Sequence, residues 1–165
     1  MIGTALAALS GQIAGVWLGK NAAEEIPAGR KYFFWLKQLL LCSLIIFLVL
    51  REFNLFLFLA GMIGGIFLRR EYAYFGMILA GNITLLSAGL IFVYGIPLGT
   101  LVFAQRKFID LGKNALVFFL GLLTVKIAID WVTFAAGGLL TFLVLETFIV
   151  VWGEHALPGW LRPRW

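Results

Sequence analysis

Long apolar stretches alternate with short polar breaks along the whole chain. A helix that crosses a bilayer needs about 20 mainly apolar residues, within a range of about 17–25. The pattern therefore predicts an all-α fold, a polytopic integral membrane helical bundle with about six transmembrane helices in a single transmembrane domain, residues 1–165. The helices are expected at residues 2–19, 34–50, 55–68, 72–94, 114–130 and 132–152.

The second and third predicted helices are short, with apolar runs of about 15 residues, or roughly 22 Å at the helical rise. Polar breaks at residues 51–54 and 69–71 end them. Aromatic flanks and snorkelling arginines can extend such helices to the membrane surface. The alternative is a partial, re-entrant hairpin, which would need protein around its polar break. Two short spanning helices are the preferred interpretation.

The fourth predicted helix is followed by Gly95, Pro97 and Gly99, which are typical helix breakers. Beyond them, residues 98–110 carry apolar side chains on one side and polar side chains elsewhere. This pattern predicts an interfacial helix along the lipid headgroups, or an extension of the fourth helix.

Two boundaries fit the last two apolar runs. A turn between Asp130 and Trp131 leaves Asp130 at the surface and Lys126 one turn inside, where its stem can snorkel. Lys126 and Glu146 would then differ in depth by about 15 Å. A turn at Gly137 and Gly138 would instead bring Lys126 and Glu146 to similar depth, close enough to pair. The first boundary is preferred because it spares two buried charges.

Four polar side chains within the apolar runs are the candidate functional residues. Glu146, Lys126 and Asp130 are ionisable groups, each of which costs about 2.5–3.5 kcal/mol at the centre of a membrane helix. Asn82 is an amide inside the fourth predicted helix, where an interhelical hydrogen bond is the alternative role. Together these residues predict a polar path centred on Glu146.

Small residues recur at every fourth position of the first predicted helix, which forms a groove for close helix packing. The groove consists of Gly3, Ala7, Gly11, Gly15 and Gly19. Packing against another helix of the same chain is preferred over a subunit interface, because glycine is common in membrane helices.

The composition supports a membrane environment. Hydrophobic residues make up 62% of the 165 positions and charged residues only 13%, whereas soluble domains average about 25% charged. The net charge is +5, but the basic residues form short groups between apolar runs, as expected for contact with anionic lipid headgroups and not with nucleic acid. The groups are Lys20, Arg30, Lys31 and Lys37; Arg69 and Arg70; Arg106, Lys107 and Lys113; and Arg162 and Arg164.

Recognisable catalytic chemistry is absent from the sequence. Glu24, Glu25 and Arg30 resemble the glutamate pair and arginine of intramembrane CAAX-type proteases. In that family three residues separate the glutamate pair from the arginine, whereas four residues separate Glu25 from Arg30. The family also needs further histidines within its helices, and this chain has only His155. Cys42 is the only cysteine, so no histidine and cysteine metal cluster can be built. No catalytic residue, metal or other cofactor is expected.

These observations predict a multi-pass protein of the cell membrane that acts as a transporter or channel for an ion, a proton or a small solute. The alternative is a non-catalytic subunit or substrate-capture component of a larger membrane complex. Substrate-capture subunits of vitamin importers are similar in size and helix count. The expected partners are the lipid bilayer and either further copies of the chain or a larger membrane complex.

Overall fold

A computed structural model describes residues 2–51, 53–81, 84–105, 108–126 and 130–156. These residues form seven α-helices and one short 3₁₀ helix, without strands. The elements are α1 (Ile2–Asn21), α2 (Ile26–Arg51), α3 (Leu55–Phe67), α4 (Glu71–Gly81), α5 (Leu85–Ala104), α6 (Phe108–Leu122), the 3₁₀ helix η1 (Leu123–Lys126) and α7 (Trp131–Ala156).

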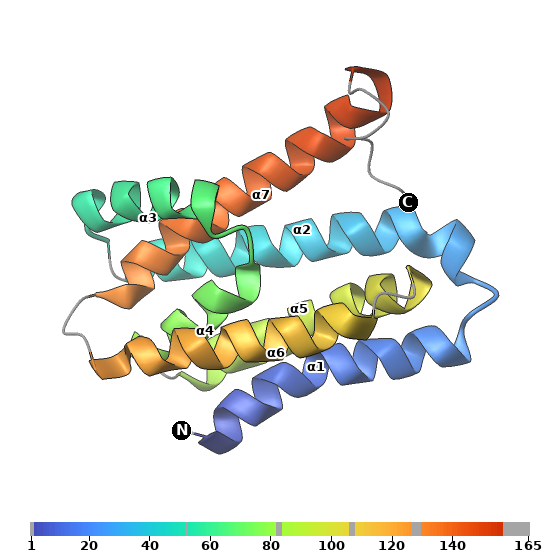
Figure 1. The fold of residues 1–165 in the computed structure, drawn as a ribbon, viewed down its shortest axis with the longest axis horizontal. Coiled ribbons are helices and arrows are strands. Elements are labelled where there is room, and N and C mark those ends of the chain that lie inside the picture. Colours follow the sequence, from blue (N-terminus) through green and yellow to red (C-terminus); the bar gives the residue numbers. More distant parts are fainter. Residues whose placement is uncertain (1, 52, 82–83, 106–107, 127–129, 157–165) are drawn as a thin grey trace.

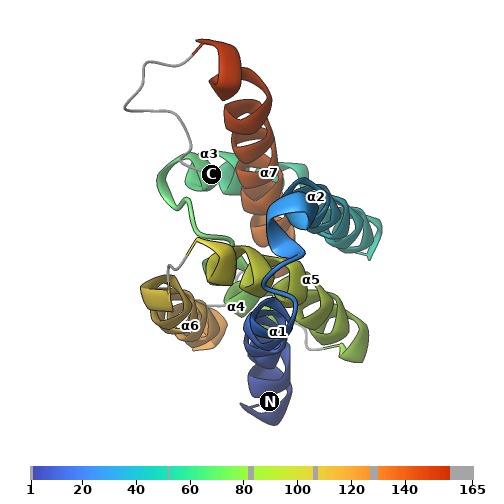
Figure 2. The ribbon, with the colours of Figure 1, turned by 90° about the vertical axis from the view of Figure 1, so that its right-hand side faces the viewer.

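The helices form two groups that face each other. Helices α2, α3 and α7 lie on one side, and α1, α4, α5 and α6 lie on the other (Figures 1 and 2). The closest pairs are α1 with α5, α3 with α7, and α4 with α6, while α2 packs against both α5 and α7. Eight of the eleven residues of α4 are buried, so this short helix fills the centre of the bundle.

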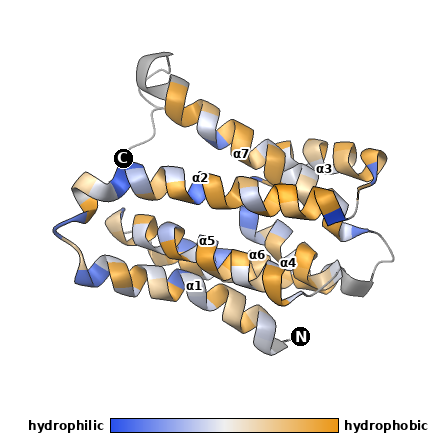
Figure 3. Cartoon of the chain, turned by 180° about the vertical axis from the view of Figure 1, so that it is seen from behind, coloured by the Kyte–Doolittle hydropathy of each residue, from blue (hydrophilic) through white to orange (hydrophobic). Residues whose placement is uncertain are grey.

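Three helical segments are long and apolar enough to cross a membrane: Ala28–Arg51, Leu85–Ala104 and Trp131–Val151. Hydrophobic residues make up most of the length of the helices (Figure 3), and many of the large ones are exposed. Leu50, Phe67 and Leu85, for example, are exposed. The described residues therefore form an all-helical fold with three segments that are long and apolar enough to span a membrane.

Reciprocal glycine contacts hold the three closest helix pairs together. In α1, an added Cβ at Gly11 would come within 2.0 Å of the carbonyl oxygen of Phe92 in α5, and Gly15 stands in the same relation to Ile96 at 2.1 Å. Gly61 of α3 and Gly76 of α4 make equally close approaches, to Phe134 of α7 and Phe118 of α6. Only glycine permits backbones to come this close.

The small-residue groove of α1 divides into two parts. Gly11, Gly15 and Gly19 face α5 of the same chain. Gly3 has no atom within 4 Å of an added Cβ, and Ala7 is exposed. The hydroxyl of Thr100 in α5 donates to the carbonyl oxygen of Gly15 at 3.1 Å, which adds a polar contact to the close approach.

The prediction of one helix over residues 72–94 is wrong. Helix α4 ends at Gly81, and α5 begins at Leu85. The physical reason is a capping box, in which the side chain of Thr84 accepts from the backbone N–H of Ser87 and the hydroxyl of Ser87 accepts from the backbone N–H of Thr84. Thr84 and Ser87 thus start a new helix. Asn82 lies outside the described residues.

The predicted interfacial helix over residues 98–110 is not a separate element in the described part of the chain. Residues 98–104 are the end of α5, and Phe108 begins α6. Helix α5 continues through Pro97, and Gly95 and Gly99 face the backbone of Gly11 and Gln12 in α1. These glycines serve helix packing instead of breaking the helix.

Helices α2 and α6 also differ from the predicted residue ranges, whereas the start of α7 agrees with one prediction. Helix α2 begins eight residues before the predicted residue 34, with Pro27 in its first turn, where proline is favoured. Helix α6 covers Phe108–Leu122 instead of residues 114–130. Helix α7 begins at Trp131, which matches the first of the two boundaries considered, and the carboxylate of Asp130 accepts from the backbone N–H groups of Val132 and Thr133.

Candidate functional site

A break between two half-length helices lies beside the middle of the bundle. Helices α3 and α4 contain 13 and 11 residues, so neither reaches the roughly 17–25 residues of a spanning helix. Along the long axis of Figure 1, the link between them, residues 68–70, lies between the two ends of α2 and not at an end of the bundle, and Arg69 and Arg70 line one cavity with Lys37 of α2. The chain thus returns on itself partway across and places charged side chains there.

Lys37 of α2 and Glu146 of α7 form an ion pair at this level. The side chain of Lys37 is only 3% exposed, and that of Glu146 is 28% exposed. The amide nitrogen of Gln38 donates to the second carboxylate oxygen of Glu146 at 2.9 Å. Phe34 and Phe142 place their rings 5.5 and 5.8 Å from the lysine nitrogen, within range of cation–π attraction. Glu146 therefore has two partners on one helix.

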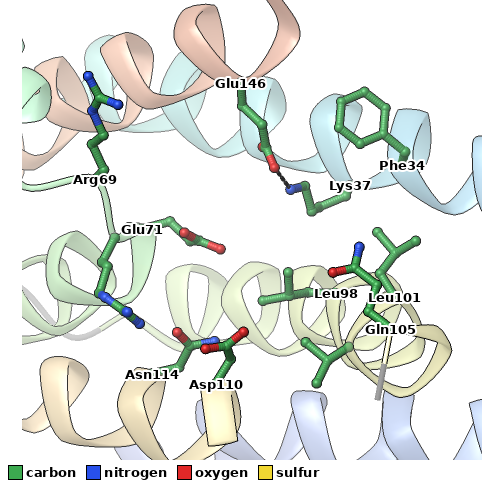
Figure 4. Close-up of a pocket in the computed structure, with 12 residues that line it drawn as sticks. Phe34, Lys37, Arg69, Glu71, Leu98, Leu101, Gln105, Asp110, Asn114 and Glu146 are labelled. Atoms are coloured by element: carbon green, nitrogen blue, oxygen red, sulfur yellow. Dashed lines mark hydrogen bonds and ion pairs between the residues drawn. The ribbon is translucent and has the colours of Figure 1, made fainter. Parts of the chain in front are cut away.

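Glu71, the first residue of α4, brings a second carboxylate toward this pair. Its side chain is buried and points from the α3–α4 break toward Lys37 and Glu146 (Figure 4). The hydroxyl of Tyr94 in α5 donates to Glu71 Oε1 at a long 3.4 Å. The pKa of Glu71 is raised, mainly because burial disfavours the charged carboxylate. The positive charge of Lys37 lowers this pKa, and the negative charge of Glu146 raises it.

These groups line a cavity of about 280 Å³, enough for several water molecules. Helix α5 supplies an apolar wall, and α6 adds Asp110 and the buried amide of Asn114 (Figure 4). The lining residues are Phe34, Lys37, Arg69, Arg70, Glu71, Leu98, Leu101, Val102, Gln105, Asp110, Asn114 and Glu146. The cavity is thus predominantly polar inside a bundle whose outside is apolar.

Some of the charged side chains around the cavity have an ion-pair partner among the described residues, and others do not. Glu146 is neutralised by Lys37, and Asp110 lies 4.0 Å from Lys113. Arg69 donates to the carbonyl oxygen of Ile66 at 3.3 Å, and no contact of this kind involves the side chain of Arg70 within the described residues. Among the described residues, the carboxylate of Glu71 has the long contact with Tyr94 and a contact with its own backbone N–H, and no ion pair. The cavity consequently contains a carboxylate and guanidinium groups that are not tied into short ion pairs among the described residues.

Of the four predicted path residues, the two whose side chains the structure describes, Glu146 and Asp130, do not come together. Glu146 lines the cavity, whereas Asp130 caps the first turn of α7, 16 residues earlier and about 24 Å away along the helix. Lys126 is the last residue of η1, and its side chain lies outside the described part of the structure, as does Asn82. The partners of Glu146 in the structure are Lys37 and Gln38.

Sequence reasoning missed Lys37, Gln38, Glu71 and Asn114. Lys37 was assigned to a basic group at the membrane surface, and Glu71 to the polar end of a helix. The available signal was Pro27, which marks a helix start ten residues before Lys37 and so places that lysine well inside α2. No feature of the neighbouring sequence distinguishes a charged break at the membrane surface from a charged break that lines a cavity.

The chemistry of the cavity is that of carboxylates, amides and cationic side chains. Within the described ranges, no group of three or more histidine, cysteine, aspartate or glutamate residues is placed to hold a metal ion. Such a set of side chains can bind or exchange a proton and can contact an ion or polar solute. In comparisons with known proteins, no protein-family model, no curated protein and no solved structure matches the chain.

Proposed function

We propose that this chain is a small multi-pass membrane transporter or channel, and that the cavity beside the α3–α4 break is its polar path. The proton is the ion that the charges next to Glu71 favour. The supporting observation is the position of Glu71, which lies at the break between two half-length helices and faces the Lys37–Glu146 pair.

The membrane setting rests on the distribution of apolar residues. Three long apolar segments and an apolar outer face would leave much hydrophobic surface in water, whereas a bilayer covers it without cost. Helices α1 and α6 run alongside these segments (Figure 1), so a bilayer that surrounds them surrounds the whole bundle.

The broken helix pair is the feature that favours transport. Non-helical backbone at membrane depth is tolerated where protein buries it or where it lines a water-filled cavity. Transporters commonly place their binding sites at such discontinuous helices. Residues 68–70 fit this description, because Arg69 and Arg70 line the cavity next to Glu71.

The charges that act on Glu71 favour the proton as the ion. Glu71, Glu146 and Lys37 together carry a net charge of −1 when all three are ionised, whereas Arg69, Arg70 and Asp110 bring the whole lining of the cavity to zero. A single uncompensated charge in such a site is costly, and uptake of one proton removes it. The ion pair already satisfies Glu146, so the proton belongs on Glu71 at rest. Exchange of the Lys37 contact between the two carboxylates would then move that proton.

Proton flux into liposomes tests this proposal. The full chain is reconstituted with a pH-sensitive dye inside, and a potassium diffusion potential drives protons inward. Wild type should acidify the lumen faster than protein-free liposomes, and Glu71→Gln and Glu146→Gln should each reduce the rate at least tenfold. Glu24→Gln and Glu25→Gln remove the same charge from exposed positions and should leave the rate unchanged. Wild-type flux in both cavity variants would exclude the path.

A role as non-catalytic subunit of a larger complex is the second candidate, and the geometry of α7 favours it. Only 28% of the most apolar stretch of Trp131–Val151 is buried inside the bundle. In the second half of α7, the side chains of Val144, Ile149 and Val151 are exposed. That half diverges from α2 (Figure 1), so it offers an apolar face to a partner helix. Gentle extraction followed by mass measurement distinguishes the candidates, because stable co-purification with other chains would support the subunit role.

A further inference from the structure

A second hollow lies on α6, next to the cavity. Its volume is about 420 Å³, and its lining residues are Arg70, Ile109, Gly112, Lys113, Leu116 and Val117. Arg70 also lines the charged cavity, so it separates the two spaces. The hollow is therefore an apolar groove with two cationic side chains.

The shape of the groove follows from Gly112. Ile109 and Leu116 are large, exposed side chains about one turn before and after it on the same face of α6. No atom lies within 4 Å of the position that a Cβ at Gly112 would take. The missing side chain leaves a notch between two apolar ridges, which suits a flexible hydrocarbon chain that lies along the helix.

The charge of the groove is positive. Lys113 is 55% exposed, and its nearest acidic oxygen, on Asp110, is 4.0 Å away, at the limit of an ion pair. Arg70 is partly buried and has no hydrogen bond or ion pair from its side chain in the part of the chain that the structure describes. Two cations with one distant carboxylate leave room for a ligand anion.

We propose that this groove binds an anionic phospholipid, with the phosphate between Arg70 and Lys113 and an acyl chain along the apolar side chains of α6. Apolar ridges alone would accept any lipid, and cations alone would accept any anion. The combination selects a molecule with both features, and a bilayer supplies it at high local concentration. Arg70 also lines the cavity of the proposed transport path, but binding of a lipid in the groove does not require transport.

Binding of dioctanoyl phosphatidylglycerol to the purified full chain tests the site, with native mass spectrometry as the readout. Each basic side chain contributes about fivefold to the affinity for an anionic lipid, so Arg70→Gln combined with Lys113→Gln should weaken binding about 25-fold. Gly112→Leu fills the notch without a change in charge and should also weaken binding several-fold. Leucine favours the helix more than glycine, so this variant is expected to fold.

Matched controls come from elsewhere on the surface. Lys20→Gln combined with Lys31→Gln removes two exposed positive charges, and Gly89→Leu adds the same side chain at an open position of α5. Both should bind the lipid as wild type does. Equal affinities of wild type and both groove variants would overturn the proposal. So would equal binding of dioctanoyl phosphatidylcholine to wild type, because the site would then not recognise the negative charge.

Discussion

Lys37 of α2 and Glu146 of α7 are 109 residues apart in the sequence and form an ion pair inside the bundle. The pair joins α2, near the start of the sequence, to α7, near its end. Gln38 of α2 adds a second contact to Glu146. An ion pair that is largely removed from water stabilises a fold only weakly, but the loss of one partner leaves an uncompensated charge. This relationship gives the first prediction.

Single substitutions in the pair should destabilise more than the double substitution. Lys37→Met or Glu146→Leu alone should lower the free energy of unfolding by about 3 kcal/mol, since each strands one buried charge. The double variant should lose less than the sum of the two, with a coupling energy of about 0.5–3 kcal/mol. Thermal unfolding in detergent measures this cycle. Additive losses would show that the two side chains do not interact.

Alanine at Gly15 should separate α1 from α5. An added Cβ would lie 2.1 Å from the carbonyl oxygen of Ile96, so the helix backbones must move apart, and a loss of stability of about 1–3 kcal/mol is expected. Gly3→Ala is the matched control on the same helix, because no atom lies within 4 Å of its Cβ position. It should be neutral or stabilising by up to about 1 kcal/mol. Equal effects of the two would contradict the packing described for this pair.

Asp130 should act as a helix cap and not as a path residue. Its carboxylate accepts hydrogen bonds from the backbone of Val132 and Thr133 and from the hydroxyl of Thr133. Asp130→Ala should cost about 1 kcal/mol of stability, and Asp130→Ser should retain most of the cap while it removes the charge. Proton flux in liposomes should be unchanged in Asp130→Ser. A proton flux in Asp130→Ser as low as that in Glu146→Gln would show that Asp130 is part of the polar path.

The helical fold was predictable from the sequence because apolar runs and glycine spacing are local signals. The partners of Glu146 were not predictable. Pro27 marks where α2 begins, but the contact of Glu146 with Lys37 also depends on how α2 packs against α7, which is set by tertiary contacts. The helix predicted at residues 55–68 agrees with α3, but the end of α4 at Gly81 was not predicted. Thr84 and Ser87 can start a helix or sit within one, and only their hydrogen bonds in the structure decide between these roles.

The most direct test of the account compares two cysteines on α5 in a Cys42→Ser background. Leu98→Cys lines the charged cavity, whereas Val93→Cys faces outward from a side chain that is 42% exposed in the isolated chain. A hydrophilic thiol reagent needs a thiolate and therefore water. Faster labelling of Leu98→Cys is expected in proteoliposomes, because water fills the cavity and lipid covers Val93. Faster labelling of Val93→Cys would contradict this expectation, as would a Leu98→Cys that does not react.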